Sequence, residues 1–517
     1  MERFIQRHAD KVIGVLSGFD RLVFRGTLRR IAFVDGLMAF LGWKHVLLKH
    51  FGAYAHAVSE RIKTASCQAA RDQGRPIQYL ASSRTSKEAI ASRIAERDGI
   101  RQGLICILTC VEPCRTFEIY RNRDAKRLEL VNRIRKCLHL YHYFIDPEFG
   151  FMHARIQTWF PFNVQVCLNG REWLSRMMDH DHMDYRRRDN CFPWIADVDR
   201  AQHLSDRMLR RSWPAILRRF AHLLNPAHRE IFSDDARGYY WSVYQSEWAT
   251  DVMFRDARAL ASIYPHLVRH GMSTFSSADV MRFLGARLRP GMFDGEIVSD
   301  FKDRPEGVRI KHRLEANSVK LYDKQGSVLR AETTLQDASA FKVFRAKEGD
   351  PQGPKAWRPM RRGIADLHRR ARVSHACNER YLEALASADT SQPLGDLVQS
   401  VSRPVRWNGY RFRGLRPWTL DDLALFQVVC RGEFAIQGFR NRDLLPLLFP
   451  APAQNSGELR RRSARISRQI RLLRAHGLIR KIPSSYRYQL TPRGRETLIT
   501  IVATQQVTLN QLNRAIA

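Results

Sequence analysis

A tyrosine lies among cations and a carboxylate in the segment 307–335. Two runs of β-forming residues flank Gly326, which predicts a hairpin with this glycine in the left-handed turn position. A three-residue loop would place four polar side chains on one face of the hairpin: Tyr322, Lys320, Arg330 and Glu332. A tyrosine beside cations, with a carboxylate for a metal ion, is what transesterification at a phosphodiester requires.

In this hypothesis Tyr322, Lys320 and Arg330 are catalytic. The alternative is a sheet tyrosine held in a structural network of ion pairs.

Two further carboxylates could complete a site for Mg²⁺ or Mn²⁺. Glu247 and Asp251 are four residues apart in the aromatic-rich segment 239–251. Residues at this spacing share one face of a helix, so both could bind a metal ion together with Glu332. The alternative is aromatic core packing with two acidic residues at the surface.

A second candidate surface lies in the predicted strands on either side of the turn Asp146–Gly150. Side chains that suit stacked bases and phosphates alternate along these two strands: His139, Tyr141, Tyr143, His153, Arg155 and Gln157. The alternative is a core sheet with a polar edge.

The last hundred residues have the pattern of three helices, a two-stranded hairpin and a final helix. The expected elements are a helix that begins after Thr419, helices over Asn441–Leu448 and about 458–476, strands over Leu478–Ile482 and Tyr486–Leu490, and a helix after Thr491. The basic residues of the third helix and the hairpin are expected to contact DNA: Arg460, Arg461, Arg462, Arg465, Arg468, Arg471, Arg474, Arg480, Lys481 and Arg487. A solvated helix normally mixes charges of both signs, whereas one sign dominates this helix. The alternative partner is another protein.

Two segments resemble known families. The run Gly477–Lys481, followed by Tyr486–Gly494, resembles winged-helix regulators of the MarR type, which implies a winged-helix DNA-binding domain. The pattern Lys-x-Tyr-Asp-Lys and Leu-Arg-x-Glu around Tyr322 is similar to rolling-circle replication initiators of filamentous phages and some plasmids. Those proteins nick one DNA strand through a tyrosine with a divalent metal. The chain as a whole also resembles a large group of uncharacterised bacterial proteins.

The overall charge indicates a polyanionic partner. The chain has 517 residues with 86 Lys and Arg against 52 Asp and Glu, a formal net charge of +34. Neutralising phosphates releases counterions and drives binding, so nucleic acid is the expected partner, DNA before RNA. No apolar run reaches the roughly 18 residues of a membrane-spanning helix, and the N-terminus lacks the apolar centre of a signal peptide. A cytoplasmic protein without a membrane partner is therefore expected.

Nine cysteines, an odd number, do not suggest a disulfide framework. Cys106, Cys110 and Cys114 fall in or near a predicted buried strand, where cysteine acts as a small hydrophobic residue.

The pattern of elements predicts a multidomain α+β protein with central antiparallel sheets and flanking helices. The expected regions are a helical N-terminal region at 1–65, an α+β domain at 66–235, a second α+β region at 236–388, a linker at 389–417 and the winged helix at 418–517. The leading hypothesis is a DNA-binding protein of mobile-element character that nicks a strand or initiates replication. The alternative is a non-enzymatic regulator or structural binder of DNA or RNA.

Overall fold

The chain divides into two compact units in the computed structural model. The first unit comprises residues 1–11, 256–323 and 377–517, and the second comprises residues 12–255 and 324–376. The described residues are 1–232, 238–273, 275–286, 296–302, 309–347, 349–350, 352–386, 394–431, 433–434, 438–483 and 485–505. Gly307, Val308 and the predicted linker residues 389–393 lie outside them.

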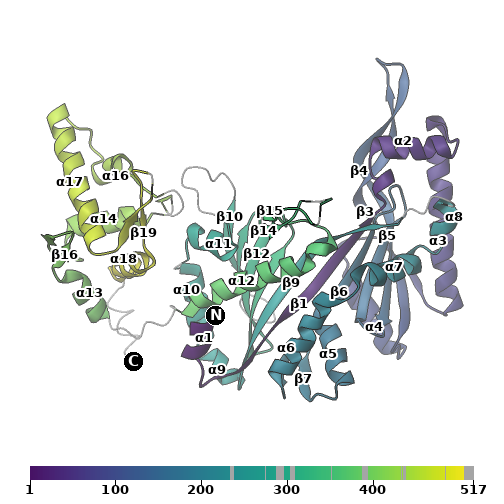
Figure 1. Cartoon of the computed structure of the whole chain (residues 1–517), viewed down its shortest axis with the longest axis horizontal. Helices are drawn as coiled ribbons and strands as arrows, with labels where there is room; N and C mark the ends of the chain where they lie inside the picture. The colour runs from purple at the N-terminus through teal and green to yellow at the C-terminus, as the bar shows by residue number, and fades with distance from the viewer. Residues whose placement is uncertain are drawn as a thin grey trace. The chain divides into compact units, whose positions relative to one another are not determined.

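The second unit is built on eight strands in the order β13-β9-β1-β6-β5-β4-β3-β2 (Figure 1). Their bounds are β1 (Val12–Thr27), β2 (Ile77–Leu80), β3 (Gly103–Asn122), β4 (Arg127–Asp146), β5 (Gly150–Gln157), β6 (Val164–Asn169), β9 (Tyr240–Phe254) and β13 (Val328–Leu335). All neighbouring pairs are antiparallel except β2 with β3. The expected α+β class is confirmed, although the sheet is mixed.

Helices cover both faces of this sheet. One face packs against α2 (Val34–Trp43), α3 (Phe51–Asp72), α7 (Trp213–Leu224) and the first part of α12 (Leu367–Leu385), and the other carries α4 (Lys87–Arg97), α5 (Gly170–His180) and α6 (Val198–Arg207). Smaller elements are η1 (Arg29–Ile31), η2 (Leu48–His50), β7 (Tyr185–Arg188), β8 (Cys191–Ile195), η3 (Met208–Arg210), α8 (His228–Phe232), β14 (Lys342–Arg345), β15 (Ala356–Pro359) and η4 (Ile364–Asp366). Alternate residues of β5 and β6 are apolar and buried in the core, as a sheet with a packed face requires.

Two regions that the sequence pattern assigned to helices are strands. Residues 12–27, within the predicted helical N-terminal region, form β1 at the centre of the sheet, and residues 240–254 form its neighbour β9. Both segments are rich in Val, Phe and aromatic residues, and long-range pairing fixes the strand conformation. Short apolar runs have the same local pattern in a buried strand and a buried helix.

The first unit begins with α1 (Glu2–Arg7) and returns at residue 256. Its next elements are α9 (Ala257–Ala261), α10 (Tyr264–Ser273), α11 (Ser277–Phe283), β10 (Ile297–Lys302), β11 (Arg309–Leu314) and β12 (Asn317–Lys324), of which the last residue, Lys324, belongs to the second unit. The unit continues with the end of α12 from Cys377, with α13 (Leu394–Ser402), β16 (Val405–Trp407) and β17 (Tyr410–Phe412), and with the C-terminal elements. β10, β11 and β12 pair antiparallel in sequence order.

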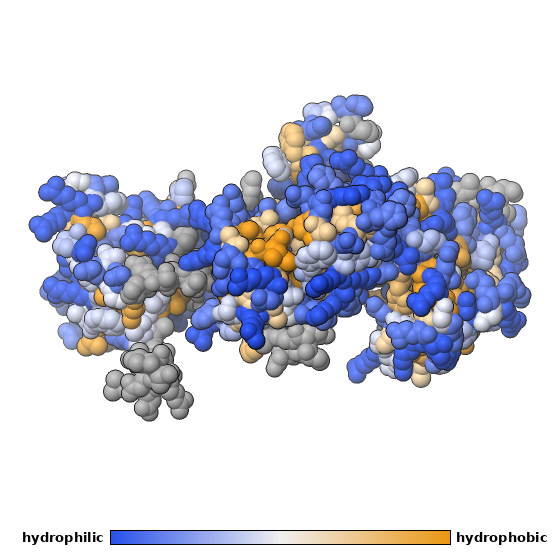
Figure 2. Space-filling view, turned by 90° about the horizontal axis from the view of Figure 1, so that it is seen from below, coloured by the Kyte–Doolittle hydropathy of each residue, from blue (hydrophilic) through white to orange (hydrophobic). Residues whose placement is uncertain are grey.

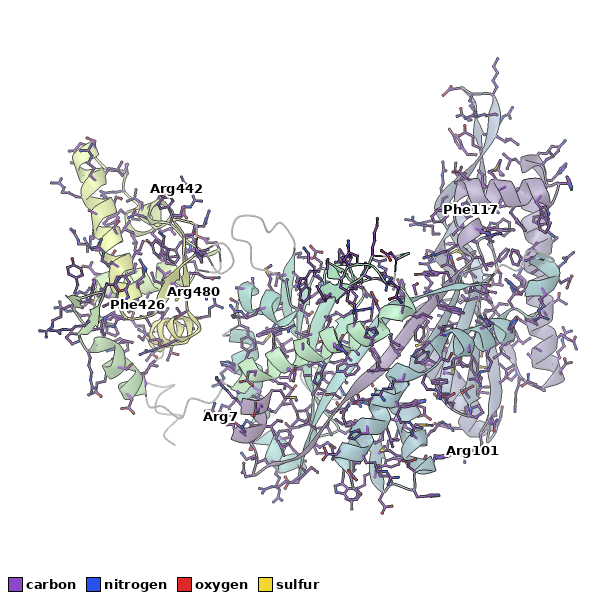
Figure 3. The ribbon with its side chains drawn as sticks, viewed as in Figure 1. Arg7, Arg101, Phe117, Phe426, Arg442 and Arg480 are labelled. Atoms are coloured by element: carbon purple, nitrogen blue, oxygen red, sulfur yellow. A yellow bond between two sulfur atoms is a disulfide. The ribbon has the colours of Figure 1, made fainter. Side chains whose placement is uncertain are left out.

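The C-terminal elements follow the expected order. They are α14 (Leu420–Val429), α16 (Asn441–Leu448), α17 (Ser456–Ala475), β18 (Ile479–Lys481), β19 (Tyr488–Leu490) and α18 (Pro492–Thr504). Gly477 ends α17 with a φ of 71°, and the Thr491 hydroxyl accepts a hydrogen bond from the Gly494 N–H at 2.9 Å, which caps α18. The helices enclose an apolar core that contains Phe426, and Arg442 and Arg480 lie outside it (Figure 3).

A long hairpin extends from β3 and β4, with its tip near residues 122–127 (Figure 1). Residues 132–136 of β4 are all exposed, whereas Phe117 and Thr116 of β3, which pair with Asn132 and Arg133, are buried. A disulfide joins Cys114 to Cys137 across the two strands. The expectation that Cys114 acts only as a small hydrophobic residue was therefore wrong, because cross-strand pairing brings a distant cysteine beside it. His139 lies within 4.8 Å of both sulfur atoms, but a disulfide has no thiolate for a metal ion.

Hydrophilic side chains cover most of the face that Figure 2 shows, as the net charge of +34 predicts. None of the helices in the described ranges combines the length and the apolar character that crossing a bilayer needs.

Candidate metal centre and nucleic-acid surfaces

Three carboxylates converge on one face of the second unit's sheet. Asp20 of β1, Glu247 of β9 and Glu332 of β13 each offer an oxygen, and these oxygens lie within 4.8 Å of one another. Asp20 and Glu332 are buried, whereas Glu247 is partly exposed and opens the cluster to solvent. Carboxylate oxygens at this spacing are the ligands that Mg²⁺ and Mn²⁺ prefer. We call this group the carboxylate cluster.

A β-bulge brings Asp20 into the cluster. Phe19 pairs with Trp248 and Arg21 pairs with Glu247, so Asp20 is the extra residue of β1. A bulge re-aims the side chain of its extra residue, and bulges are frequent beside active sites. The start of α5 packs directly on this bend, since a Cβ on Gly170 would overlap the Phe19 carbonyl oxygen.

The pKa of Asp20 is raised above its ordinary value. Burial is the main cause, and the charges of Glu332 and Asp251 add to it, while Arg330 and Arg171 act in the opposite direction. Burial and the neighbouring carboxylates disfavour the ionised form of Asp20, and a cation bound beside it would stabilise that form.

Asp251, which the sequence hypothesis made a metal ligand, has another role. Arg330 donates two hydrogen bonds to its carboxylate, at 2.6 and 2.9 Å, and Arg171 lies 3.0 Å from it. Although burial opposes ionisation, these two guanidinium groups hold the pKa of Asp251 below its ordinary value. Asp251 therefore neutralises buried arginines, and Asp20 takes its place in the cluster.

Arg330, which the sequence suggested as a catalytic residue, is buried and committed to hydrogen bonds within the protein. Its side chain is fully buried, so it has no access to a substrate. Besides Asp251, it donates to Asp20 at 3.2 Å and to the Asn190 carbonyl oxygen at 2.7 Å. These bonds fix Asp20 and the loop that carries Asn190.

Two polar oxygens beside the cluster have no hydrogen-bond partner among the described residues. Thr334 lies opposite Glu247 in the strand register and two residues from Glu332, and its buried hydroxyl is unpaired. The Asn190 amide donates to Asp20 at 2.8 Å, and its buried Oδ1 is unpaired. Both oxygens could therefore accept a hydrogen bond from a bound water molecule or contact an ion.

A cavity of about 260 Å³ adjoins the cluster. Arg21 and Asn190 are part of its wall, together with Glu88, His153, Cys167 and Glu172. Arg21 pairs with Glu247 in the strand register, and Asn190 bonds to Asp20, so the cavity opens beside the carboxylates. Solvent and a small part of a substrate could occupy it.

No protein-family model, curated protein or solved structure matches the chain.

The residues of the predicted Tyr322 site are divided between the two units. Tyr322 and Lys320 lie on β12 of the first unit, both half-buried, whereas Arg330 and Glu332 lie on β13 of the second. Gly326 has a φ of 84°, the left-handed conformation that was expected. The carboxylate cluster forms within the second unit alone, without Tyr322.

The predicted platform on β4 and β5 has the expected register but is covered. His139, Tyr141 and Tyr143 pair with Gln157, Arg155 and His153 across the two strands. Both tyrosines and His139 are more than 90% buried, and Tyr141 and Tyr143 belong to a core cluster that includes residues of α4. Arg155 is committed to Glu112, at 2.7 Å. Base stacking needs an open aromatic face, so these six residues do not form the expected platform.

Buried histidines in this region are expected to make the fold sensitive to acid. Burial lowers the pKa of His139 and of His142 from 6.5 to about 4. As the pH falls below 6.5, the unfolded chain takes up protons that the folded chain does not, so stability is lost between pH 6.5 and about 4. Each histidine contributes a loss of about 3 kcal/mol, which is large beside a typical net stability.

We expect His142→Asn to flatten the pH dependence of the free energy of unfolding between pH 6.5 and 4. Denaturant titration at several pH values measures this slope, whatever the variant's stability at neutral pH. The same substitution at an exposed position on α3, His56→Asn, is the matched control. An unchanged slope in His142→Asn would contradict this assignment.

The arginines of α17 form one exposed arc. Five of them are exposed: Arg460, Arg461, Arg465, Arg468 and Arg471. With about 100° of rotation per residue around the helix axis, these five side chains span an arc of about 140°. The buried stripe of Ile466, Ile470 and Leu473 lies on the opposite side of the helix. We call these five residues the arginine arc.

Arg465 of the arc pairs with Asp421 of α14 at 2.7 Å, and three other residues of the predicted DNA contact also have partners. Arg462 pairs with Glu458 at 2.6 Å, Arg474 lies 4.8 Å from the Trp407 ring centroid, and Arg487 donates to the Gly438 carbonyl oxygen at 3.1 Å. Arg480 and Lys481 of the hairpin are exposed. The arginine arc and these two hairpin cations are thus the accessible part of the predicted surface.

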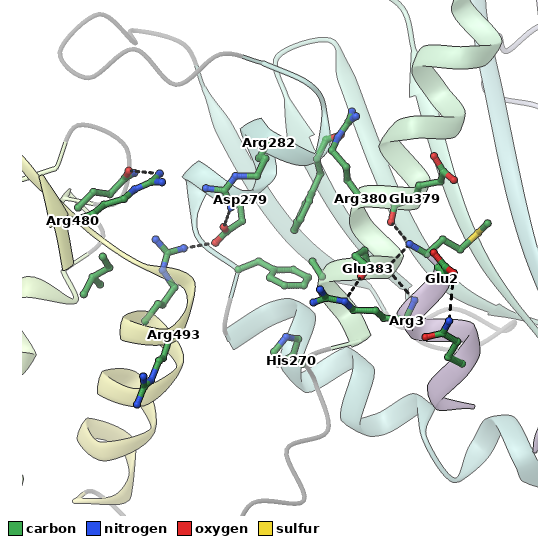
Figure 4. A pocket seen from close by; sticks show the side chains of 18 residues that line it. Glu2, Arg3, His270, Asp279, Arg282, Glu379, Arg380, Glu383, Arg480 and Arg493 are labelled. Carbon is green, nitrogen blue, oxygen red and sulfur yellow. Dashed lines mark hydrogen bonds and ion pairs between the residues drawn. The ribbon is translucent and has the colours of Figure 1, made fainter. Parts of the chain in front are cut away.

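The first unit also has a pocket of about 1190 Å³ with a charged wall (Figure 4). Glu383 pairs with the N-terminal amino group at 2.7 Å, and Asp279 pairs with Arg282 at 2.9 Å and with Arg495. Asp279 and Glu383 are thus engaged by neighbouring cations, and the described acids of this pocket do not converge as those of the carboxylate cluster do.

Proposed function

We propose that this protein binds nucleic acid and cleaves one of its strands with a divalent cation held by Asp20, Glu247 and Glu332. The observation that carries the proposal is the convergence of these carboxylates within 4.8 Å on a sheet face. A divalent cation at such a site polarises a phosphate oxygen and lowers the pKa of a water molecule. The residues of the chain hold the ligands in place: Arg330 and Asn190 fix Asp20, and the bulge aims it.

The charge of the chain supports nucleic acid as the substrate. Carboxylates that bind a metal ion occur in many hydrolases, but here they belong to a chain of net charge +34. We further propose that residues 418–517 are a winged-helix domain of the MarR type whose third helix, α17, enters the major groove. The order of elements and the arginine arc support this proposal.

The direct test is a nicking assay on supercoiled plasmid. We expect conversion to the open circle with Mn²⁺ or Mg²⁺ and none in EDTA, since the reaction depends on the cation. Binding of the same plasmid is measured in parallel. Binding without nicking under either metal would leave the alternative function, a non-enzymatic binder of DNA or RNA, which the arginine arc supports without any chemistry.

The same assay identifies the nucleophile. Tyr322→Phe removes one hydroxyl and keeps the ring. Equal nicking by this variant would assign the attack to water, and loss of nicking with normal binding would assign it to Tyr322. The proposed role of the carboxylate cluster holds in both cases.

A further inference from the structure

A second bulge lies on the strand beside Asp20, at Tyr244. Val23 pairs with Gln245 and Phe24 pairs with Val243, so Tyr244 is the extra residue of β9. Its side chain is 47% exposed, in contrast to the buried tyrosines of β4. Tyr244 precedes Glu247 by three residues, which is about 10 Å along a strand. The two bulges thus present one carboxylate and one open aromatic ring on neighbouring strands.

An arginine without a carboxylate partner lies next to this ring. Arg25 pairs with Ser242 of β9 and with Gln165 of β6, and Gln165 pairs in turn with Arg155 of β5. The Arg25 guanidinium is half-buried and has no ion pair among the residues that the structure describes. Four residues along β1 separate it from Arg21, about 13 Å.

The surroundings of Arg25 are cationic. Burial lowers its pKa below the ordinary value, and the charges of Arg155 and Arg115 lower it further, while Tyr244 acts in the opposite direction. Arg155 already has Glu112 as its partner, so Arg25 is the half-buried guanidinium group that an added anion would stabilise. Phosphate accepts the bidentate hydrogen bonds of arginine, and an exposed ring beside it suits a base.

We propose that Tyr244 and Arg25 bind one nucleotide of a single-stranded substrate, the ring by stacking on the base and the guanidinium by holding the phosphate. This inference rests on the proposed function and names its substrate class. A base in a duplex is stacked on both sides and cannot meet a side-chain ring, so the strand must be unpaired here. The bound nucleotide would lie about 10 Å along β9 from Glu247. One single-stranded nucleic acid could therefore contact Tyr244 and also enter the carboxylate cluster.

The test measures binding of a fluorescein-labelled single-stranded oligonucleotide to the full chain in EDTA, by anisotropy. We expect Tyr244→Ala to weaken binding by about tenfold and Tyr244→Phe to bind like the wild type, because phenylalanine keeps the stacking face. Arg25→Gln should reduce the slope of log affinity against log salt by about 0.7, the value for one lost phosphate contact on a single strand. Duplex affinity should barely change in all three variants.

Two control variants remove similar side chains elsewhere. Tyr79→Ala removes an exposed tyrosine from the edge strand β2, and Arg218→Gln removes an exposed arginine from α7 on the opposite face. Both should bind like the wild type. The inference is overturned if Tyr244→Ala binds the single strand at wild-type strength with wild-type thermal stability, if Tyr79→Ala loses as much, or if duplex affinity falls equally. EDTA removes the cation, so these binding results do not depend on nicking. A failure to nick DNA would therefore count against the proposed function and not against this inference.

Discussion

Replacing Glu332 by Gln is expected to reduce nicking by about 10³-fold while binding of plasmid stays at the wild-type level. Glutamine keeps the shape of the side chain but removes the charge that attracts a divalent cation. Glu332 is 98% buried, so this loss is not compensated by solvent. Binding of Mn²⁺, followed by the decrease of its free-ion electron spin resonance signal, should weaken in parallel.

The pH dependence gives a second measure of the same site. The cation requires ionised Asp20, whose pKa is raised by burial and by its carboxylate neighbours. Affinity for Mn²⁺ should therefore fall as the pH decreases through this raised pKa, at a higher pH than an ordinary aspartate would give. Asp20→Asn should bind Mn²⁺ weakly and lose that pH dependence.

Two variants separate loss of the cation from loss of the fold. Glu60→Gln removes an exposed carboxylate from α3 and should nick like the wild type. Asp251→Asn leaves Arg330 and Arg171 without their charge partner and should lower the free energy of unfolding by about 3–5 kcal/mol. Undiminished nicking by a folded Glu332→Gln would remove the carboxylate cluster from the proposed function.

The sequence identified part of the carboxylate cluster by its residue types but not by its geometry. Glu247 and Glu332 were expected to meet, and they do, although Glu247 lies on a strand rather than a helix. Asp20 was missed because residues 12–27 were assigned to a helix, and because a bulge has no signature in strand alternation. The alternation of Val, Leu and Phe after Val12 was the available signal.

Exposure was harder to predict than register. The pairing of β4 with β5 agrees with the spacing of their polar residues, yet α4 covers Tyr141 and Tyr143. A sheet face shows the same alternation whether water or a helix covers it, so the sequence of the two strands cannot decide between them. Tyr244 shows the converse, since a bulge exposes it within an aromatic segment that reads as core.

The C-terminal elements were predicted closely because their signals are local. The bounds of α16 agree with the expected Asn441–Leu448, and Gly477 and Thr491 end and begin helices as their types suggest. Capping residues and helical periodicity act over a few residues, whereas the pairing of β1 with β9 joins segments more than 200 residues apart in the sequence.

Changing Arg461, Arg468 and Arg471 together to Gln should weaken duplex DNA binding by about 10²- to 10³-fold near physiological salt. These residues belong to the arginine arc, and none of them has a carboxylate partner among the described residues. Arginine and glutamine have similar helix propensities, so the fold should be retained. If each contacts a phosphate, the slope of log affinity against log salt should fall by about three.

A matched triple variant distinguishes a defined interface from general attraction by a net charge of +34. Changing Arg84, Arg93 and Arg218 to Gln removes the same charge from exposed positions in the second unit. Long-range attraction would weaken equally in both triple variants, whereas a contact by α17 changes the salt slope only in the first. Equal slopes would mean that the arginine arc does not contact phosphates, and would favour a protein partner for these helices.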